Sequence, residues 1–317
     1  MTVNTPLIYN DPLLAEYNFG NEHPFGPDRY HAYASAFAAE ALSNEITVGR
    51  ACLASDEDIL RFHTSEYLTH VKGCSATGIG YLDGGDTPSF KGVYESAARV
   101  VGTTLAAAHA LMCGEYKRTF VPIAGLHHAR RDSTAGFCVF NDCGVVIEVL
   151  RQQYGVRKIA YVDIDAHHGD GVFYSFEDDA HLCFVDFHED GRFLYPGTGT
   201  AAETGIAKAK DTKLNIPMPM GATDDMFLQA WPAAETFIRK AQPEIILLQA
   251  GVDSLAGDPI THMQYSEQAH AYATERLCKL ANIYSEGRIL AMGGGGYNLD
   301  NIARGWCAVV KSLINTE

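Results

Sequence analysis

The sequence predicts an α/β fold, with one three-layer α/β/α domain that covers residues 1–317 and has a mostly parallel central sheet. Three observations support this prediction. Helical and strand patterns alternate from about residue 92 onward. The strand segments are apolar on both faces, which is typical of a parallel sheet covered by helices on both sides. No low-complexity tract, internal repeat or flexible linker divides the chain.

Five segments have the apolar spacing or the end signals of helices. Most of them begin at polar side chains that can accept hydrogen bonds from the free amide groups of a first turn. In chain order we expect helices over 92–113, from Asn141 or Asp142 to a stop at Gly155, from Thr223 with Pro232 near its first turns, from Ser266 to Ala281, and over 300–314.

Short, almost wholly apolar runs lie between these helices and predict five buried strands, at 119–123, 158–164, 182–187, 245–249 and 288–292. Polar side chains and glycines gather just after the end of each run. In an open parallel sheet, ligands bind outside the carboxyl ends of the strands. The sequence therefore predicts one crevice that is lined by five separate segments.

The chain has 24 Lys and Arg against 39 Asp and Glu, a formal net charge of −15. Such a surface repels nucleic-acid phosphates and anionic membranes, and it attracts cationic partners. No apolar stretch reaches the ~18 residues of a membrane span. We therefore expect no direct nucleic-acid or membrane partner, and a lysine-rich substrate is favoured.

The eight cysteines are scattered, without a Cys-x-x-Cys pair and mostly among apolar neighbours. This pattern is typical of buried reduced thiols and not of a disulfide framework or a thiolate zinc site. The first residues, from Met1 to Pro6, show no basic segment leading into an apolar core, so no secretory signal is expected. Together these features predict a cytoplasmic protein.

The densest cluster of reactive side chains is Asp163-Ile-Asp-Ala-His-His-Gly-Asp170, after the second apolar run. At strand spacing, Asp163, Asp165 and His167 share one face. Carboxylates and an imidazole suit zinc or iron(II) better than calcium or copper, and three protein ligands leave a position for water. Asp253, at the end of another apolar run, is the natural third ligand. A lone aspartate often only caps a loop, but the whole cluster favours a catalytic metal.

Adjacent histidines, His127 and His128, follow the first apolar run. Both seldom serve as core packing, because each ring nitrogen needs a partner. One can act as a general base while the other donates to an oxyanion or a leaving group. Asp163 and Asp170 are the carboxylates available to orient the two rings. Without a metal cluster nearby, such a pair would more often be structural.

Four glycines precede Tyr297 and place its phenol on a tight turn. Glycine lets the backbone approach a site closely and adopt a positive φ. A tyrosine there can donate a hydrogen bond to a carbonyl oxygen opposite the metal. The alternatives are a flexible loop with a surface tyrosine and a phosphate-binding loop. The second is disfavoured, because no Gly-Lys-Ser/Thr follows.

The motifs resemble, in order and spacing, the zinc-dependent histone deacetylase family, of the class I type and of bacterial acetoin-utilisation-type deacetylases. They are Gly125-Leu-His-His-Ala129, Gly136-Phe-Cys-Val-Phe-Asn-Asp142, Asp163-Ile-Asp-Ala-His-His-Gly-Asp-Gly171, Pro196-Gly-Thr-Gly199, Gly251-Val-Asp253 and Gly293-Gly-Gly-Gly-Tyr-Asn-Leu299. Segments 23–29 and 58–67 extend the match to about residues 17–314. The resemblance implies an arginase/deacetylase-like fold and hydrolysis of N-acyl-lysine to lysine and a carboxylate.

The resemblance also implies a role for each matched side chain. Asp165, His167 and Asp253 would hold zinc. His128, backed by Asp170, would be the general base. His127, backed by Asp163, would be its electrostatic partner and a proton donor. Tyr297 would polarise the acyl carbonyl.

A narrow tunnel for the lysine methylenes is implied as well. Gly136, Phe137 and Tyr195 would form its walls, Asp86 would bind substrate backbone amides at the rim, and Arg29 would lie near an internal acetate pocket. Leu194 and Tyr195 stand where the family commonly has two phenylalanines, so a hydroxyl is expected at the tunnel mouth.

An inner potassium site is a further implication of the resemblance. The family usually places a Ser or Thr side chain there, and this chain has Asp186. A potassium ion would take Asp186 together with the backbone of Asp163, Asp165, His167 and Phe187. The additional negative charge either tightens cation binding or replaces the cation with a hydrogen-bonded network.

Three other functions stay open at this point. An arginase-like ureohydrolase would need a second metal, for which the chain offers only Asp258 after Asp253. A non-catalytic acyl-lysine binding protein would have lost a ligand, the base or the tyrosine, and all are retained. An acetylpolyamine amidohydrolase suits the acidic charge equally well. The sequence leaves open zinc against iron(II), the acyl length, the physiological substrate and the oligomeric state.

Overall fold

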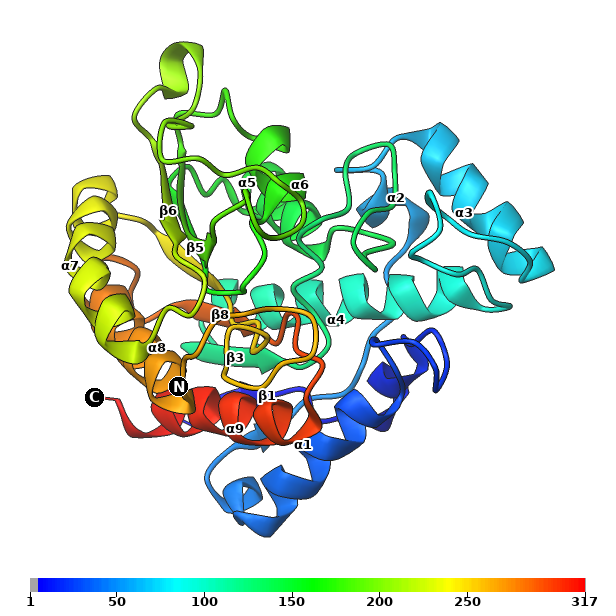
Figure 1. The fold of residues 1–317 in the computed structure, drawn as a ribbon, viewed down its shortest axis with the longest axis horizontal. Coiled ribbons are helices and arrows are strands. Elements are labelled where there is room, and N and C mark those ends of the chain that lie inside the picture. The colour runs from blue at the N-terminus through cyan, green and yellow to red at the C-terminus, as the bar shows by residue number, and fades with distance from the viewer. Residues whose placement is uncertain (1–4, 317) are drawn as a thin grey trace.

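Eight strands pair side by side in one sheet, in the order β2-β1-β3-β8-β7-β4-β5-β6 (Figure 1). The computed structural model describes residues 5–316. Every pairing in this sheet is parallel, so the predicted α/β fold is confirmed. The strands are β1 (Leu7–Ile8), β2 (Thr47–Val48), β3 (Arg118–Val121), β4 (Ile159–Asp163), β5 (Leu182–Glu189), β6 (Lys213–Met218), β7 (Ile245–Gln249) and β8 (Ile289–Met292).

The five apolar runs of the sequence all form strands, namely β3, β4, β5, β7 and β8, and each is buried along its whole length. Three strands carry no such signal. β1 and β2 have two residues each, too few for a pattern. β6 includes Lys213, Asn215 and Pro217, and it forms an edge of the sheet, where a missing N–H can face away from the neighbouring strand.

Helices cover both faces of the sheet (Figure 1). One layer consists of α1 (Asp28–Ala39), α7 (Asp224–Ala241), α8 (Glu267–Tyr284) and α9 (Leu299–Asn315). The other contains α4 (Val93–Met112) and α5 (Asp142–Tyr154), against which α2 (Asp56–Ile59), α3 (Ser65–Thr77) and α6 (Asp170–Ser175) pack. Short 3-10 turns lie at Pro12–Glu16, Leu42–Asn44 and Ala207–Ala209.

The ends of α5 follow the sequence signals. The side chain of Asn141 accepts a hydrogen bond from the Gly144 amide at 2.7 Å, and Gly155 ends the helix in the left-handed conformation. The expectation for Pro232 was wrong, because it lies in the middle of α7 and not in its first turns. α1 was not predicted, since its buried face includes the charged Arg29.

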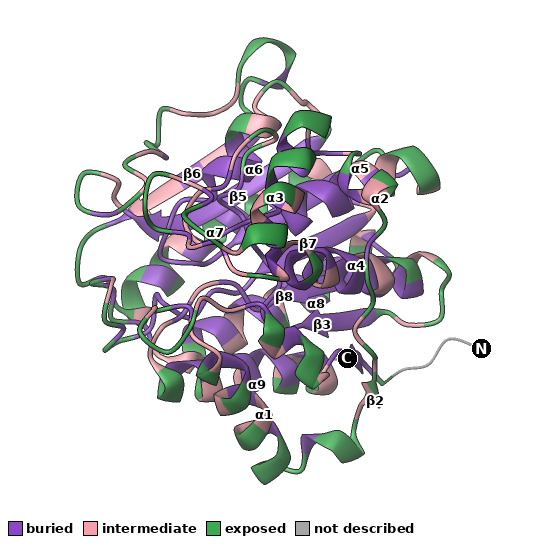
Figure 2. Ribbon diagram, turned by 90° about the vertical axis from the view of Figure 1, so that its right-hand side faces the viewer, coloured by how far each residue is buried: buried purple, intermediate pink, exposed green. Residues whose placement is uncertain are grey.

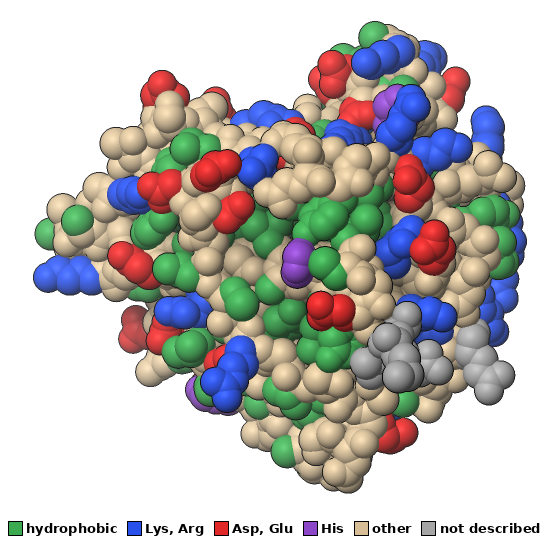
Figure 3. Space-filling view, turned by 180° about the vertical axis from the view of Figure 1, so that it is seen from behind, with side chains coloured by type: hydrophobic (Ala, Val, Ile, Leu, Met, Phe, Trp, Pro, Cys, Tyr) green, Lys and Arg blue, Asp and Glu red, His purple; other side chains and the backbone are tan. Residues whose placement is uncertain are grey.

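Buried residues run through the sheet, and exposed residues lie on the outer helix faces and in the loops (Figure 2). Seen from behind, acidic side chains are dispersed among basic and apolar ones and form no single patch (Figure 3). Within residues 5–316, no helix combines the length and the apolar character needed to cross a bilayer. The predicted lack of a secretory signal concerns mainly Met1–Asn4, which lie outside the described residues.

Candidate active site

The loops after β3, β4 and β8 meet at the carboxyl edge of the sheet. They enclose a cavity of about 20 Å³, enough for one water-sized group. Its lining includes the adjacent histidines, two metal-ligand candidates and the tyrosine of the glycine-rich loop, which are His127, His128, Asp165, His167 and Tyr297. Of the five segments expected to line one crevice, those after β3, β4 and β8 line this cavity, together with Phe25, and those after β5 and β7 do not.

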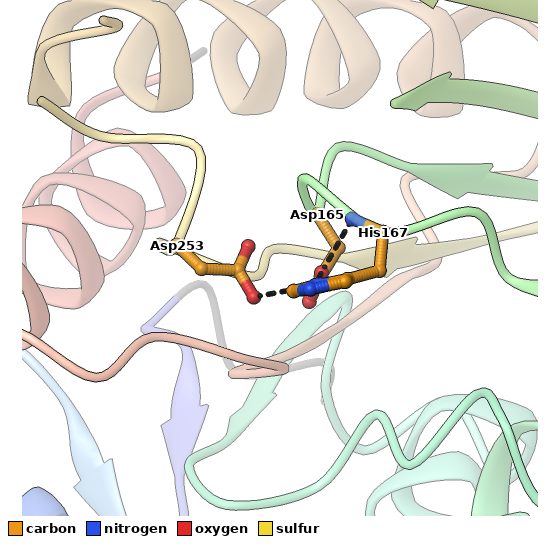
Figure 4. A group of neighbouring side chains, drawn as sticks. All are labelled: Asp165, His167 and Asp253. Atoms are coloured by element: carbon orange, nitrogen blue, oxygen red, sulfur yellow. Dashed lines mark hydrogen bonds and ion pairs between the residues drawn. The ribbon is translucent and has the colours of Figure 1, made fainter. Parts of the chain in front are cut away.

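Asp165, His167 and Asp253 come together at this cavity (Figure 4). Their ligand atoms lie within 4.8 Å of one another, and no other group of three or more such side chains between residues 5 and 316 does so. Nδ1 of His167 lies 3.0 Å from Oδ1 of Asp165 and 3.1 Å from Oδ2 of Asp253. One N–H bond satisfies two carboxylates poorly, whereas a divalent cation satisfies all three donors.

The electrostatics of the group also fit a cation. Asp253 is fully buried, and burial together with the negative charge of Asp165 raises its pKa to about 7, against the opposing effect of His167. The two buried carboxylates therefore favour additional positive charge, which a bound divalent metal would supply.

Strand alternation does not bring these ligands together. β4 ends at Asp163, so Asp165 and His167 lie in the loop that follows it, and the shared strand face expected from their spacing was wrong. The loop is instead held by its backbone. The amide of Ala166 donates to Oδ1 of Asp253 at 2.8 Å, and the amide of Asp165 donates to Oδ1 of Asp163 at 3.1 Å.

Two glycines let the backbone approach the carboxylates. The amide of Gly295 donates to Oδ2 of Asp165 at 2.8 Å, and a Cβ at Gly295 would lie 2.2 Å from Oδ2 of Asp253. At Gly251 a Cβ would lie 1.9 Å from Oδ2 of Asp165. A side chain at either position would displace a metal-ligand candidate.

The adjacent histidines each contact their own carboxylate. Nδ1 of His127 lies 2.7 Å from Oδ2 of Asp163, and Nδ1 of His128 lies 2.7 Å from Oδ1 of Asp170. The two Nε2 atoms are 3.1 Å apart. With their Nδ1 atoms occupied, both rings present Nε2 to the cavity.

Their surroundings give the two rings different charges. Burial lowers the pKa of His127, but Asp163 and Asp165 more than compensate and raise it to about 10. Burial and the neighbouring positive His127 lower the pKa of His128 to about 4, although Asp170 opposes them. At neutral pH, His128 is therefore neutral and can accept a proton, whereas His127 is charged.

Tyr297 lies on the loop that follows β8. Burial and the negative charge of Asp253 hold the pKa of its phenol well above the usual value, so the hydroxyl keeps its proton and can donate. Its backbone amide donates to Oδ2 of Asp258 at 2.8 Å. The ring centroid lies 5.9 Å from that of Phe137.

Arg29 is buried beneath the same loop. Its Nε donates to the carbonyl of Gly296 and its Nη2 to the carbonyl of Gly294, both at 2.7 Å. The guanidinium carbon lies 5.5 Å from the centroid of the Tyr297 ring. Nη1 is also buried, and no partner for it is found between residues 5 and 316. One strong donor beside the tyrosine is therefore free.

The predicted tunnel walls lie around the same site. The Tyr195 ring lies 5.2 Å from that of His128 and 6.4 Å from that of His167, and Tyr195 is 47 % exposed. Gly136 has a φ of +52°, and a Cβ there would lie 2.4 Å from Cδ2 of His128. Phe137 contacts Tyr297 from another side. Aromatic rings therefore flank the metal-ligand group and the tyrosine.

Asp186 is engaged by protein groups. Its Oδ1 lies 2.6 Å from Nδ1 of His188, and its Oδ2 accepts from the amide of Gly169 at 2.8 Å. Nε2 of His188 lies 2.8 Å from the carbonyl of Gly199. Burial lowers the pKa of His188, but the adjacent Asp186 carboxylate more than compensates and raises it. Both oxygens of Asp186 therefore have hydrogen-bond partners in the protein, as expected for the hydrogen-bonded network that is the alternative to a potassium ion.

Sequence reasoning missed positioning roles for three polar residues. Nε2 of Gln249 donates to Oδ2 of Asp165 at 2.9 Å. Asp142, expected only as a helix cap, accepts from the amide of Leu126 at 2.7 Å. Asp258 orients the backbone of Tyr297, as described above. A glutamine at the end of an apolar run is a signal that could have been used, whereas the two aspartate contacts join distant segments and have no local signature.

Comparison with known proteins agrees with this geometry. Residues 23–313 match the histone deacetylase domain family. The chain is 34 % identical over 311 residues to acetoin utilization protein AcuC of Bacillus subtilis (strain 168), covering 95 % of this chain and 80 % of the relative. It is 32 % identical over 320 residues to histone deacetylase 6 of Arabidopsis thaliana, covering 98 % and 66 %.

A solved structure gives the same result at the level of the fold. The crystal structure of the HDA15 HD domain superposes with a TM-score of 0.90 at 25 % identity, covering 99 % of this chain and 90 % of the other. The resemblance seen in the motifs is therefore confirmed over nearly the whole chain. This protein belongs to the histone deacetylase family and is a hydrolase of the deacetylase type.

Proposed function

We propose that the protein hydrolyses the amide of N-acyl-lysine, with acetyl-lysine in proteins or peptides as the substrate class. One observation supports this most strongly: a single cavity is lined by metal-ligand candidates, a neutral histidine, a charged histidine and a protonated tyrosine. Amide hydrolysis needs an activated water, a polarised carbonyl and an acid for the departing nitrogen. Each need has a candidate group here.

Asp165, His167 and Asp253 would hold the metal. The family is generally zinc-dependent, and iron(II) suits the same oxygen and nitrogen donors. When bound, the metal would supply a Lewis acid for the acyl oxygen and lower the pKa of a water molecule toward ≈ 7. We propose no potassium ion at Asp186, because both of its oxygens are already engaged.

The protein side chains would carry the proton transfers. His128, neutral and held by Asp170, would take a proton from the attacking water and deliver it to the departing amine. His127, charged and held by Asp163, would stabilise the negative charge that develops on the acyl oxygen and serve as a second proton donor. The hydroxyl of Tyr297 would donate to that oxygen, a contribution of about 3–4 kcal/mol in comparable oxyanion sites.

Binding would use the rings and charges around this centre. Gly136, Phe137 and Tyr195 would enclose the lysine methylenes, and the exposed Asp86 would accept hydrogen bonds from substrate backbone amides. The free Nη1 of Arg29 would bind the released acetate. We also place the protein in the cytoplasm, where its eight cysteines, all free, would stay reduced.

The test is a panel of acyl-lysine peptides and acetylpolyamines of different chain lengths, assayed with defined zinc or iron(II). We expect turnover of an acetyl-lysine peptide that a hydroxamate blocks, that a chelator abolishes and that added metal restores. An Asp253→Asn variant serves as the matched control with a damaged ligand set. If only acetylpolyamines were turned over, the substrate class would be acetylpolyamines and not acyl-lysine peptides. If neither class were turned over, the proposal would be refuted.

A further inference from the structure

The rim loop that carries Asp86 is hydrogen-bonded to the N-terminal segment through the side chain of His23. Within the loop, Oδ1 of Asp83 accepts hydrogen bonds from the amides of Gly85, Asp86 and Thr87, at 2.9–3.0 Å. These bonds shape the turn without fixing it to the tunnel. Asp86 is exposed, and its carboxylate has no partner between residues 5 and 316.

His23 contacts this loop from 63 residues away in the chain. Its Nδ1 accepts a hydrogen bond from the amide of Phe25 at 2.9 Å, which places the ring proton on Nε2. That Nε2 lies 2.9 Å from the carbonyl of Asp86 and donates to it. The two contacts therefore define both the tautomer and the orientation of the ring.

The same ring also contacts the tunnel wall. Its centroid lies 4.6 Å from that of Phe137, edge to face. Phe137 itself has a φ of +65°, a conformation that costs energy for a residue with a side chain. The hydroxyl of Tyr17 donates to the Phe137 carbonyl at 2.6 Å and accepts from the Val139 amide at 2.9 Å, so the N-terminal segment holds this wall in place.

We propose that His23 is a positioning residue that couples the rim carboxylate of Asp86 to the tunnel wall at Phe137. By holding the Asp86 backbone, it fixes the carboxylate over the tunnel mouth, where the carboxylate accepts hydrogen bonds from substrate backbone amides. His23 thereby favours peptide substrates over acylated amines that have no such amides. This inference rests on the rim role of Asp86 in the proposed function.

Two substitutions at His23 separate its two hydrogen bonds. In His23→Gln the side-chain amide nitrogen takes the place of Nε2 and keeps the donor to Asp86. In His23→Asn the side chain reaches only the place of Nδ1, so it keeps a partner for Phe25 and loses Asp86. Both lose the ring that contacts Phe137, which makes each the matched control of the other. His23 is half-buried, so neither variant opens the core.

The assay uses the metal-loaded enzyme and an acetyl-lysine peptide, compared with the same peptide methylated on the two flanking backbone amide nitrogens. We expect His23→Asn to lower kcat/KM for the unmethylated peptide roughly three- to tenfold, mainly through KM, as for one lost hydrogen bond. For the methylated peptide it changes kcat/KM little. His23→Gln stays near the unmutated enzyme with both. Metal content and melting temperature confirm that the variants are folded.

An Asp86→Ala background completes the test as a double-mutant cycle. We expect Asp86→Ala to lower kcat/KM for the unmethylated peptide and His23→Asn to add no further loss to it. If Asp86→Ala lowers kcat/KM but His23→Asn does not, the inference about His23 fails while the rim role stands. If Asp86→Ala has no effect, the rim role fails and the inference falls with it.

Discussion

His127 and His128 are adjacent and chemically identical, and their surroundings shift their pKa values in opposite directions. The positive charge of His127 is one cause of the low pKa of its neighbour. One dipeptide therefore supplies a neutral and a charged imidazole, which we propose as base and cation, and each ring contacts its own carboxylate, Asp163 or Asp170. The assignment can be tested by changing one carboxylate at a time.

Replacing Asp163 by asparagine removes the strongest influence that raises the pKa of His127, so that pKa falls from about 10. In the proposed mechanism His127 acts as a cation, so turnover is lost as the pH rises through the pKa of His127. A lower pKa therefore moves the alkaline limb of the kcat/KM profile to lower pH. Asp170→Asn is the control, because it lowers the pKa of His128 and moves the acid limb instead. An unchanged alkaline limb in Asp163→Asn would show that His127 does not act as a cation.

Tyr297→Phe removes one hydroxyl and leaves the ring that contacts Phe137. Because that hydroxyl is the proposed donor to the acyl oxygen, we expect kcat to fall by about 10²–10³-fold. Zinc content, measured by elemental analysis, stays at the unmutated level, since Tyr297 is not among the metal-ligand candidates. His128→Ala is the companion variant, with lost turnover and retained metal. Near-normal turnover of Tyr297→Phe would show that the Tyr297 hydroxyl is not needed to polarise the acyl carbonyl.

The residues with reactive side chains were recognisable in the sequence, because Asp, His and Tyr stand beside apolar runs and glycines. Their supporting contacts were not. Asp258 meets the amide of Tyr297 across 39 positions, and Gln249 meets Asp165 across 84. Such pairs form only when loops from different strands converge, so no pattern of neighbouring residues in the sequence predicts them.

Among the elements, the loop between β8 and α9 approaches the site with its backbone. Gly295→Ala would place a Cβ 2.2 Å from Oδ2 of Asp253. We expect the carboxylate to move and zinc affinity, measured by competition with a chromogenic chelator, to fall at least tenfold. Gly73→Ala is the matched control, because a Cβ there meets nothing within 4 Å and Gly73 lies inside α3. Equal zinc affinity in both variants would contradict the close contact.

β5 carries Asp186, whose hydrogen-bonded network we propose in place of a potassium ion. Asp186→Ser leaves Nδ1 of His188 and the amide of Gly169 without their carboxylate, and both are buried. We expect the free energy of unfolding in urea to fall by about 1–3 kcal/mol. In the unmutated enzyme, exchanging potassium for sodium in the assay leaves kcat/KM unchanged. If the unmutated enzyme clearly required potassium for activity, the proposal that the network takes the place of a potassium ion would be refuted.

At the scale of elements, prediction succeeded where one physical signal dominates. β7 has the predicted bounds, since four consecutive apolar residues, Ile245 to Leu248, run up to the polar Gln249. The shared face of Asp163, Asp165 and His167 was the instructive failure. Strand alternation ends with the strand, and beyond Asp163 the backbone bonds of Ala166 and Gly295 decide where the side chains point.

For the molecule as a whole, the order of elements was enough to predict the fold class, and it could not give the order of the strands. The sheet begins with β2 and β1, and strands of two residues are too short to show a strand pattern in the sequence. Its long central strands align their carboxyl ends, and this alignment, rather than the net charge of −15, gathers the site residues. Figure 3 shows acidic side chains dispersed over the rear face, without one acidic patch.

The whole chain should bind one catalytic metal. An arginase-like enzyme needs two, with carboxylates that bridge them, and residues 5–316 contain one group of ligand atoms within 4.8 Å. Asp258, the remaining aspartate nearby, accepts hydrogen bonds from the amides of Ile260 and Tyr297, so it is committed to the loop. We expect elemental analysis of the zinc-saturated protein to give one metal per chain, and none after Asp253→Asn and dialysis. Because bound metal neutralises buried carboxylates, its removal lowers the melting temperature. Two tightly held metals per chain, both needed for turnover, would favour the ureohydrolase type of site.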